Sequence, residues 1–80
     1  MVQAAETVDL TIDTCGTKCP MPILKAKKAL ANLESGQLLK VLTTDPGAVG
    51  DFQFFGKQTG NTVVGQTEQD GIYAIVIQRK

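Results

Sequence analysis

Apolar and polar residues alternate at the start of the chain in the way that predicts a half-buried β-strand over residues 7–13. The apolar members are Val8, Leu10 and Ile12. The alternation stops in the loop 14–18, where Gly16 permits a backbone bend that a side chain would resist. We therefore expect the strand and its loop to deliver the chain to Cys19.

An amphipathic helix is predicted next. Pro20 and Pro22 bracket Met21, and proline fits the first turn of a helix because no amide donor is required there. The helix should therefore begin at Pro20 or Met21. Its apolar stripe is Ile23, Ala26, Leu30 and Leu33, with Lys25, Lys28 and Asn32 on the other side. Gly36 is expected to end this helix as its C-cap.

A strand over residues 38–44 carries apolar residues on both faces, which predicts a central position in a sheet. Asp45 then supplies an N-cap acceptor and Pro46 a first helical residue. The second helix has an apolar stripe of Ala48, Val49, Phe52, Phe55 and Thr59. We expect it to close at Gly60-Asn61.

The chain is predicted to end in a β-hairpin. A strand over 62–68 leads to Asp70-Gly71, a two-residue hairpin signal, and then to a strand over 72–78. The order βαβαββ predicts an α/β (α+β) two-layer sandwich, a four-stranded mixed sheet with two helices on one face. We expect a tail over residues 1–6 and a single domain over 7–80.

Length, composition and charge narrow the class of protein. The 80 residues are 42% hydrophobic, and eight basic residues balance eight acidic ones, so no strong field draws the chain to DNA, RNA or an anionic membrane. The apolar runs are far shorter than the roughly 20 residues that span a bilayer. The N-terminus lacks a secretory signal pattern. We expect a cytoplasmic monomer, in which two cysteines are reduced.

Cys19 is the candidate catalytic residue. At the start of a predicted helix its sulfur would meet free amide groups and the positive end of the helix dipole, which favour the nucleophilic thiolate. Lys18 and Lys25 could add positive potential, and Pro20 and Pro22 would restrict the loop. The alternative is that Pro-x-Pro only starts a helix and that Cys19 is a small hydrophobic residue.

The residues that are absent restrict the chemistry. There is no histidine, so the chain contains no Cys–His acyl-transfer pair. Two cysteines alone do not complete a four-ligand zinc site, although a dimer could contribute four thiolates, and no glycine-rich phosphate loop is present. We expect no metal and no cofactor, and the chemistry that remains is attack of a thiolate on disulfide-like or persulfide sulfur.

Cys15 is a possible second thiol. The spacing Cys-x₃-Cys is one residue longer than the thioredoxin-like motif. Cys15 could resolve a persulfide or sulfenate on Cys19, or it could be buried at the strand end. A thiol-redox switch that uses both cysteines is therefore one alternative to sulfur transfer. A non-catalytic regulatory or RNA-interaction module is the other, although the balanced charge weighs against RNA.

Three further features have both a structural and a functional interpretation. The group Lys25, Lys27 and Lys28 is either a solvated helix face or a docking surface. Phe52, Phe54 and Phe55 are interpreted as core residues, with Phe54 expected to be the most exposed of the three, and an exposed Phe54 would indicate a contact surface. Asp45 is interpreted as a helix cap without catalytic chemistry.

The segment 13–22, Asp-Thr-Cys-Gly-Thr-Lys-Cys-Pro-Met-Pro, resembles the Cys-Pro-x-Pro signature of the TusA (SirA-like) sulfur-carrier family. The resemblance continues through segments 22–33, 44–46 and 59–61 and covers residues 8 to 79. It departs at Thr17, where the family usually has Leu, and the chain carries the additional Cys15.

The resemblance implies a fold like that of the C-terminal domain of a bacterial translation initiation factor. It also implies a persulfide on Cys19. A cysteine desulfurase or rhodanese would be the donor, and a DsrE-like or other protein the acceptor. The pathways of the family include tRNA thiolation, molybdenum-cofactor metabolism and sulfur oxidation, and the resemblance does not select among them.

Overall fold

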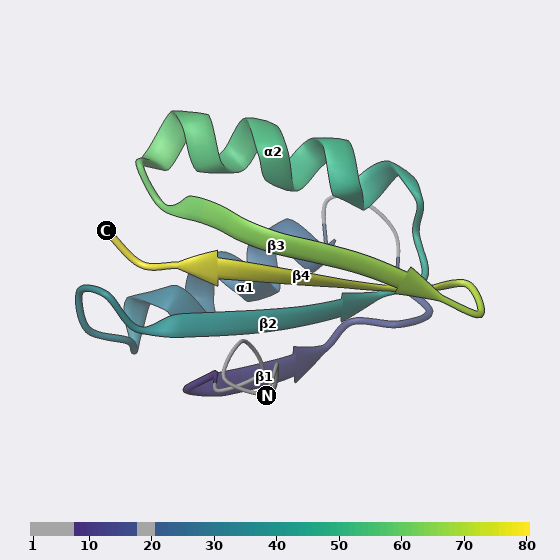
Figure 1. Cartoon of the computed structure of the whole chain (residues 1–80), viewed down its shortest axis with the longest axis horizontal. Coiled ribbons are helices and arrows are strands. Elements are labelled where there is room, and N and C mark those ends of the chain that lie inside the picture. The colour runs from purple at the N-terminus through teal and green to yellow at the C-terminus, as the bar shows by residue number, and fades with distance from the viewer. Residues whose placement is uncertain (1–7, 18–20) are drawn as a thin grey trace.

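The structure is a computed structural model that describes residues 8–17 and 21–80. One sheet and two helices follow in the order βαβαββ (Figure 1). The strands and helices are β1 (Leu10–Asp13), α1 (Met21–Ala31), β2 (Leu38–Thr43), α2 (Gly47–Thr59), β3 (Thr62–Gln69) and β4 (Ile72–Gln78). The predicted two-layer α/β architecture is confirmed.

The sheet is mixed and has the strand order β1-β2-β4-β3. β1 and β2 are parallel, with Ile12 opposite Val41, and β4 is antiparallel to both β2 and β3. β2 is an interior strand, as its apolar sequence predicts. Because β1 and β2 run in the same direction, their carboxyl ends meet at one edge of the sheet, which also holds the β3–β4 turn (Figure 1).

The core lies between the sheet and the helices. α1 contacts β1 and β2, while α2 contacts β3 and β4. The buried apolar residues are Ala26, Ala29, Leu30, Leu39, Val41, Ala48, Phe52, Phe55, Ile75 and Ile77. The rings of Phe52 and Phe55 meet edge to face, with centroids 6.1 Å apart. Each predicted helical stripe therefore faces the sheet.

The start of α2 and the hairpin turn follow their sequence signals. α2 begins at Gly47 with Pro46 as its N-cap residue, one position later than predicted. Asp45 Oδ1 still accepts a hydrogen bond from the Gly47 amide at 3.0 Å, and Pro46 already has helical φ and ψ of −61° and −26°. Asp70 and Gly71 both have positive φ, at 54° and 83°, as a tight hairpin turn requires. Gly60, with φ of 83°, caps the end of α2.

The predicted end of the first helix is wrong. α1 ends at Ala31, so Gly36 is not its C-cap. Gly36 instead turns the chain toward β2 and donates its amide to Arg79 O at 2.7 Å. The Leu30 carbonyl near the end of α1 accepts both the Leu33 amide and Arg79 Nε, each at 3.0 Å. Local amides and a long-range arginine thus take the place of the predicted glycine cap.

Within the described residues the first strand is shorter than predicted, because Val8 and Asp9 precede β1 and regular pairing begins at Leu10; residue 7 lies outside the described residues. Asp9 Oδ2 accepts the Leu38 amide at 2.8 Å, while the Asp9 amide donates to Leu38 O. The Asp9 side chain therefore accepts a hydrogen bond that a backbone carbonyl would accept in a regular strand pair. No helix among residues 8–17 and 21–80 has the length and apolar character needed to cross a membrane.

Candidate functional site

The loop that follows β1 is fastened to the end of β2 by Thr14. The backbone amide and the hydroxyl of Thr14 both donate to Leu42 O, each at 2.7 Å. The Thr14 side chain is fully buried. Because a buried hydroxyl requires a hydrogen-bond partner, this pair of bonds sets where the chain leaves the sheet.

A tight turn over residues 14–17 then reverses the chain. Thr17 donates both its amide, at 3.2 Å, and its hydroxyl, at 2.6 Å, to Thr14 O. Gly16 has φ of 85°, and its amide donates to Thr44 Oγ1 at 2.9 Å. Thr17, the position where the chain departs from the family pattern, therefore closes the turn with its own hydroxyl.

Asp13 and Cys15 form a pair at the beginning of this turn. Asp13 Oδ1 accepts the Cys15 amide at 2.9 Å, and this hydrogen bond, an interaction with the Cys15 thiol and the charge of Lys25 lower the pKa of the carboxyl. In return, the hydrogen bond to Asp13, partial burial and the negative charge of Asp13 raise the pKa of the Cys15 thiol. Cys15 is a free, half-buried cysteine that favours the protonated form.

Cys19, Lys18 and Pro20 lie outside the described residues, so their predicted roles stay predictions. In sequence Cys19 stands two positions before Met21, the first residue of α1. Pro22 is buried in the first turn of that helix, which contains no acidic residue.

The first two turns of α1 also present apolar side chains to solvent. Met21 is 41% exposed and Leu24 is 51% exposed. The lysines of the predicted solvated face, Lys25, Lys27 and Lys28, are all exposed. Phe54 on α2 is 64% exposed, so its interpretation as a core residue is wrong and the alternative, an exposed side chain, holds. Exposed apolar and cationic groups thus lie next to each other in the segment that follows the Cys-Pro-x-Pro motif.

Sequence reasoning missed Asp13, Thr14 and Thr44 as residues that organise the loop. The contact of Asp13 could have been predicted, because an aspartate side chain in a turn commonly accepts a hydrogen bond from the backbone amide two residues later. Here that amide belongs to Cys15. The partnership of Thr14 with Leu42 spans 28 positions and has no local signal.

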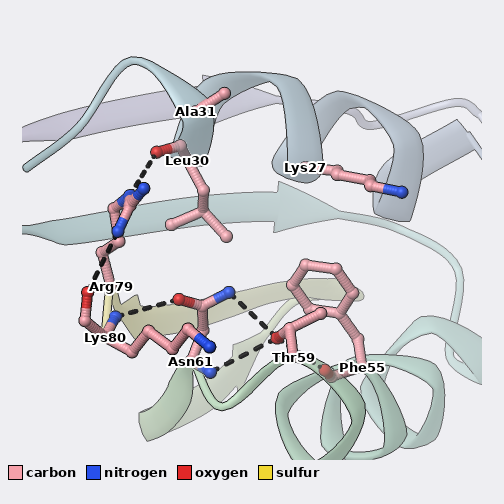
Figure 2. A pocket seen from close by; sticks show the side chains of 8 residues that line it. All are labelled: Lys27, Leu30, Ala31, Phe55, Thr59, Asn61, Arg79 and Lys80. Carbon is pink, nitrogen blue, oxygen red and sulfur yellow. Dashed lines mark hydrogen bonds between the residues drawn. The ribbon is translucent and has the colours of Figure 1, made fainter. Parts of the chain in front are cut away.

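A separate hollow lies at the opposite edge of the sheet, between the C-terminal parts of α1 and α2 (Figure 2). Its volume is about 210 Å³. A chain of hydrogen bonds holds its wall, in which Lys80 donates its amide to Asn61 Oδ1 and Asn61 Nδ2 donates to Thr59 Oγ1 (Figure 2). Lys27, Arg79 and Lys80 supply positive charge where two helices end, which complements the helix dipoles. The charges and hydrogen bonds of its wall thus stabilise the ends of α1 and α2.

Comparison with known proteins places the chain among sulfur carriers. The family described as "Sulfurtransferase TusA" matches residues 10–79. A protein of Neisseria meningitidis, whose name marks it as a candidate sulfur carrier, is 53% identical over 70 residues, which are 88% of this chain and 95% of that protein. The sulfur carrier protein TusA of Allochromatium vinosum is 46% identical over 71 residues, 89% of this chain and 93% of that one.

A solved structure agrees with these relatives. The SirA-like protein of Desulfitobacterium hafniense superposes with a TM-score of 0.79 and is 33% identical, covering 88% of this chain and 96% of that one. Sequence and fold agree over the same large share of the chain, and the predicted resemblance is confirmed: the chain belongs to the sulfurtransferase TusA family.

Proposed function

We propose that this chain carries sulfane sulfur as a persulfide on Cys19 and relays it between protein partners. The observation that carries the proposal is the start of α1 at Met21, two positions after Cys19, in a member of this family. With no carboxylate in the first turn of α1, no acidic side chain of that turn offsets the free amides and the dipole there, which favour a thiolate.

The relay consists of two sulfur-transfer steps that need no acid–base residue. The Cys19 thiolate attacks the outer sulfur of a donor persulfide, the donor's S–S bond breaks, and the donor leaves as a thiolate. An acceptor thiolate then attacks the outer sulfur on Cys19, and Cys19 leaves as a thiolate. The absence of histidine fits this chemistry, because a thiolate is an adequate leaving group.

Gly16, Pro20 and Pro22 would support Cys19 by shaping the loop, and Lys18 and Lys25 by attracting an anionic sulfur group or partner. Lys25 also acts on Asp13, so its charge is shared between the loop and any partner. Exposed Met21 and Leu24 supply apolar area for a transient protein contact.

We expect protein partners of the kind that the family resemblance implies. The donor would be a cysteine desulfurase or a rhodanese, and the acceptor a DsrE-like or other thiol protein. The dithiol switch is the weaker alternative, because Asp13 raises the pKa of the Cys15 thiol and so disfavours the form of Cys15 that would form a disulfide.

The test is sulfur loading from a cysteine desulfurase supplied with cysteine, followed by intact-mass measurement and by transfer to an acceptor thiol. The parent chain and Cys15→Ala should each gain one sulfur atom and lose it to the acceptor. Cys19→Ala should gain none. Loading of Cys19→Ala to the parent level would refute the proposal.

A further inference from the structure

The hollow between the C-terminal parts of α1 and α2 has an apolar floor (Figure 2). Leu30 of α1 and Phe55 of α2 are buried, and their side chains point into the same space. Ala31, which is exposed, continues this apolar surface. The volume of the hollow is about 210 Å³, and an enclosed apolar cavity of roughly 150 Å³ holds one benzene molecule. The hollow is therefore large enough for a small organic group.

Positive charge is concentrated at this hollow. Three of the eight basic residues of the chain line it, whereas its described lining residues include no aspartate or glutamate. The three are Lys27, Arg79 and Lys80. Because the formal net charge of the whole chain is zero, the hollow is a local positive region on a neutral protein.

The groups that form the wall do not neutralise this charge. Arg79 donates from Nε to Leu30 O and from Nη1 to Lys80 O, each at 3.0 Å, so its guanidinium is held by carbonyl oxygens. The C-terminal ends of two helices contribute roughly half a negative charge each. A terminal carboxylate on Lys80 would add one more, and the three cations would still exceed the sum. An anion that enters the hollow therefore meets a net positive charge.

Lys80 is held in place at the hollow by contacts on both its backbone and its side chain. Its amide donates to Asn61 Oδ1 at 2.9 Å, and Asn61 Nδ2 donates in turn to Thr59 Oγ1 at 2.9 Å. Its aliphatic stem lies against Gly60, where a Cβ atom would be 3.0 Å from Lys80 Cδ. A ligand that pairs with a positioned side chain has less conformational entropy to remove than one that pairs with a free side chain.

We propose that this hollow binds a small organic carboxylate. The apolar body of the ligand lies on Leu30, Ala31 and Phe55, and its anionic group lies against Lys27 and Lys80. An inorganic anion gains nothing from the apolar floor, and a neutral apolar molecule gains nothing from the lysines, so the two features together select the ligand. The site uses none of the residues of the proposed sulfur relay.

Benzoate is a suitable probe, because its ring fits the volume and its carboxylate carries one charge. Titration into the isotope-labelled protein at constant ionic strength should give saturable amide chemical-shift changes at Ala31 and Asn61, with a Kd of about 1 mM. Benzyl alcohol, which has the ring without the charge, should bind about fivefold more weakly. Acetate, which has the charge without the ring, should bind at least about tenfold more weakly. Absence of saturable shifts with benzoate, or equal binding of all three probes, would overturn the inference.

Substitutions locate the site. Lys27→Gln and Lys80→Gln remove one charge each and should each weaken benzoate binding by about twofold to fivefold. Lys28→Gln is the matched control, because it removes the same charge from the neighbouring position of α1, which does not line the hollow, and it should bind as the parent does. Ala31→Phe fills the hollow from an exposed position and should abolish the shifts, with circular dichroism to verify the fold. Equal Kd values in the three lysine variants, or undiminished binding by folded Ala31→Phe, would contradict the proposed site.

Discussion

At the scale of single residues, threonine hydroxyls hold the loop that leads to Cys19. The Thr14 hydroxyl is buried and donates to Leu42 O, and the Thr17 hydroxyl donates to Thr14 O. The first bond connects the residue after β1 to the end of β2, and the second closes the turn over residues 14–17. The position from which the chain approaches Cys19 therefore depends on a few polar contacts.

Thr14→Val removes the buried hydroxyl and keeps a similar volume. The amide of Thr14 still donates to Leu42 O, so we expect the free energy of unfolding to fall by about 1 kcal/mol, the usual net contribution of one such bond. Urea denaturation measures the change. Thr11→Val, at an exposed position of β1, the strand that precedes Thr14, is the matched control and should change stability by less than about 0.5 kcal/mol. An equal effect of both variants would contradict the role of the hydroxyl.

Asp13 should also make stability depend on pH. Because folding lowers the pKa of its carboxyl, the ionised form stabilises the fold above the ordinary pKa of aspartate, and this contribution is lost as the pH falls through the lowered value. Urea denaturation between about pH 7 and about pH 3 should show a smaller loss of stability in Asp13→Asn than in the parent. Identical losses would mean that the Asp13 interactions do not favour its charged form.

The proposal for Cys19 came from the sequence alone, because a cysteine before Pro-x-Pro has a local physical meaning. The neighbours of the loop were not accessible, since Thr14 and Leu42 meet only after the parallel pairing of β1 with β2. Asp13 was predicted only as the polar end of a strand, and its influence on Cys15 depends on the turn that follows.

At the scale of elements, the two helices differ in how they end. α2 ends at a local glycine cap, in which Gly60 has the left-handed conformation and donates its amide to Gly56 O. The sequence predicted this helix end correctly. α1 ends with the help of Arg79, 49 positions away. A local pattern could not indicate that arginine, and the C-cap was therefore misplaced at Gly36.

Two glycines of α2 give a matched test of how closely this helix approaches β3. A Cβ atom on Gly56 would lie 2.8 Å from the backbone oxygen of Asn61, whereas one on Gly50 would meet nothing within 4 Å. We expect Gly56→Ala to lower the free energy of unfolding by about 1–3 kcal/mol. Gly50→Ala should raise it by about 0.5–1 kcal/mol. Thermal unfolding measures both changes, and stabilisation by Gly56→Ala would contradict the close approach.

At the scale of the whole molecule, the sheet brings the ends of β1 and β2 and the turn that follows β1 to one edge. The carboxyl ends of β1 and β2 meet there (Figure 1), and the turn over residues 14–17 follows β1 at that edge. The order βαβαββ predicted this architecture, because short connections and apolar periodicity restrict the possible topologies. The register and the bulge between Val63 and Gly65 were not predictable, since they depend on the finished sheet.

The central claim is that Cys19, and not Cys15, bears the transferred sulfur. Lys18 separates the two cysteines in sequence, so trypsin places them in different peptides. After polysulfide treatment of the parent chain and blocking of persulfides by alkylation, the additional sulfur should be found by mass spectrometry in the peptide that begins at Cys19. Additional sulfur confined to the peptide that contains Cys15 would contradict the account.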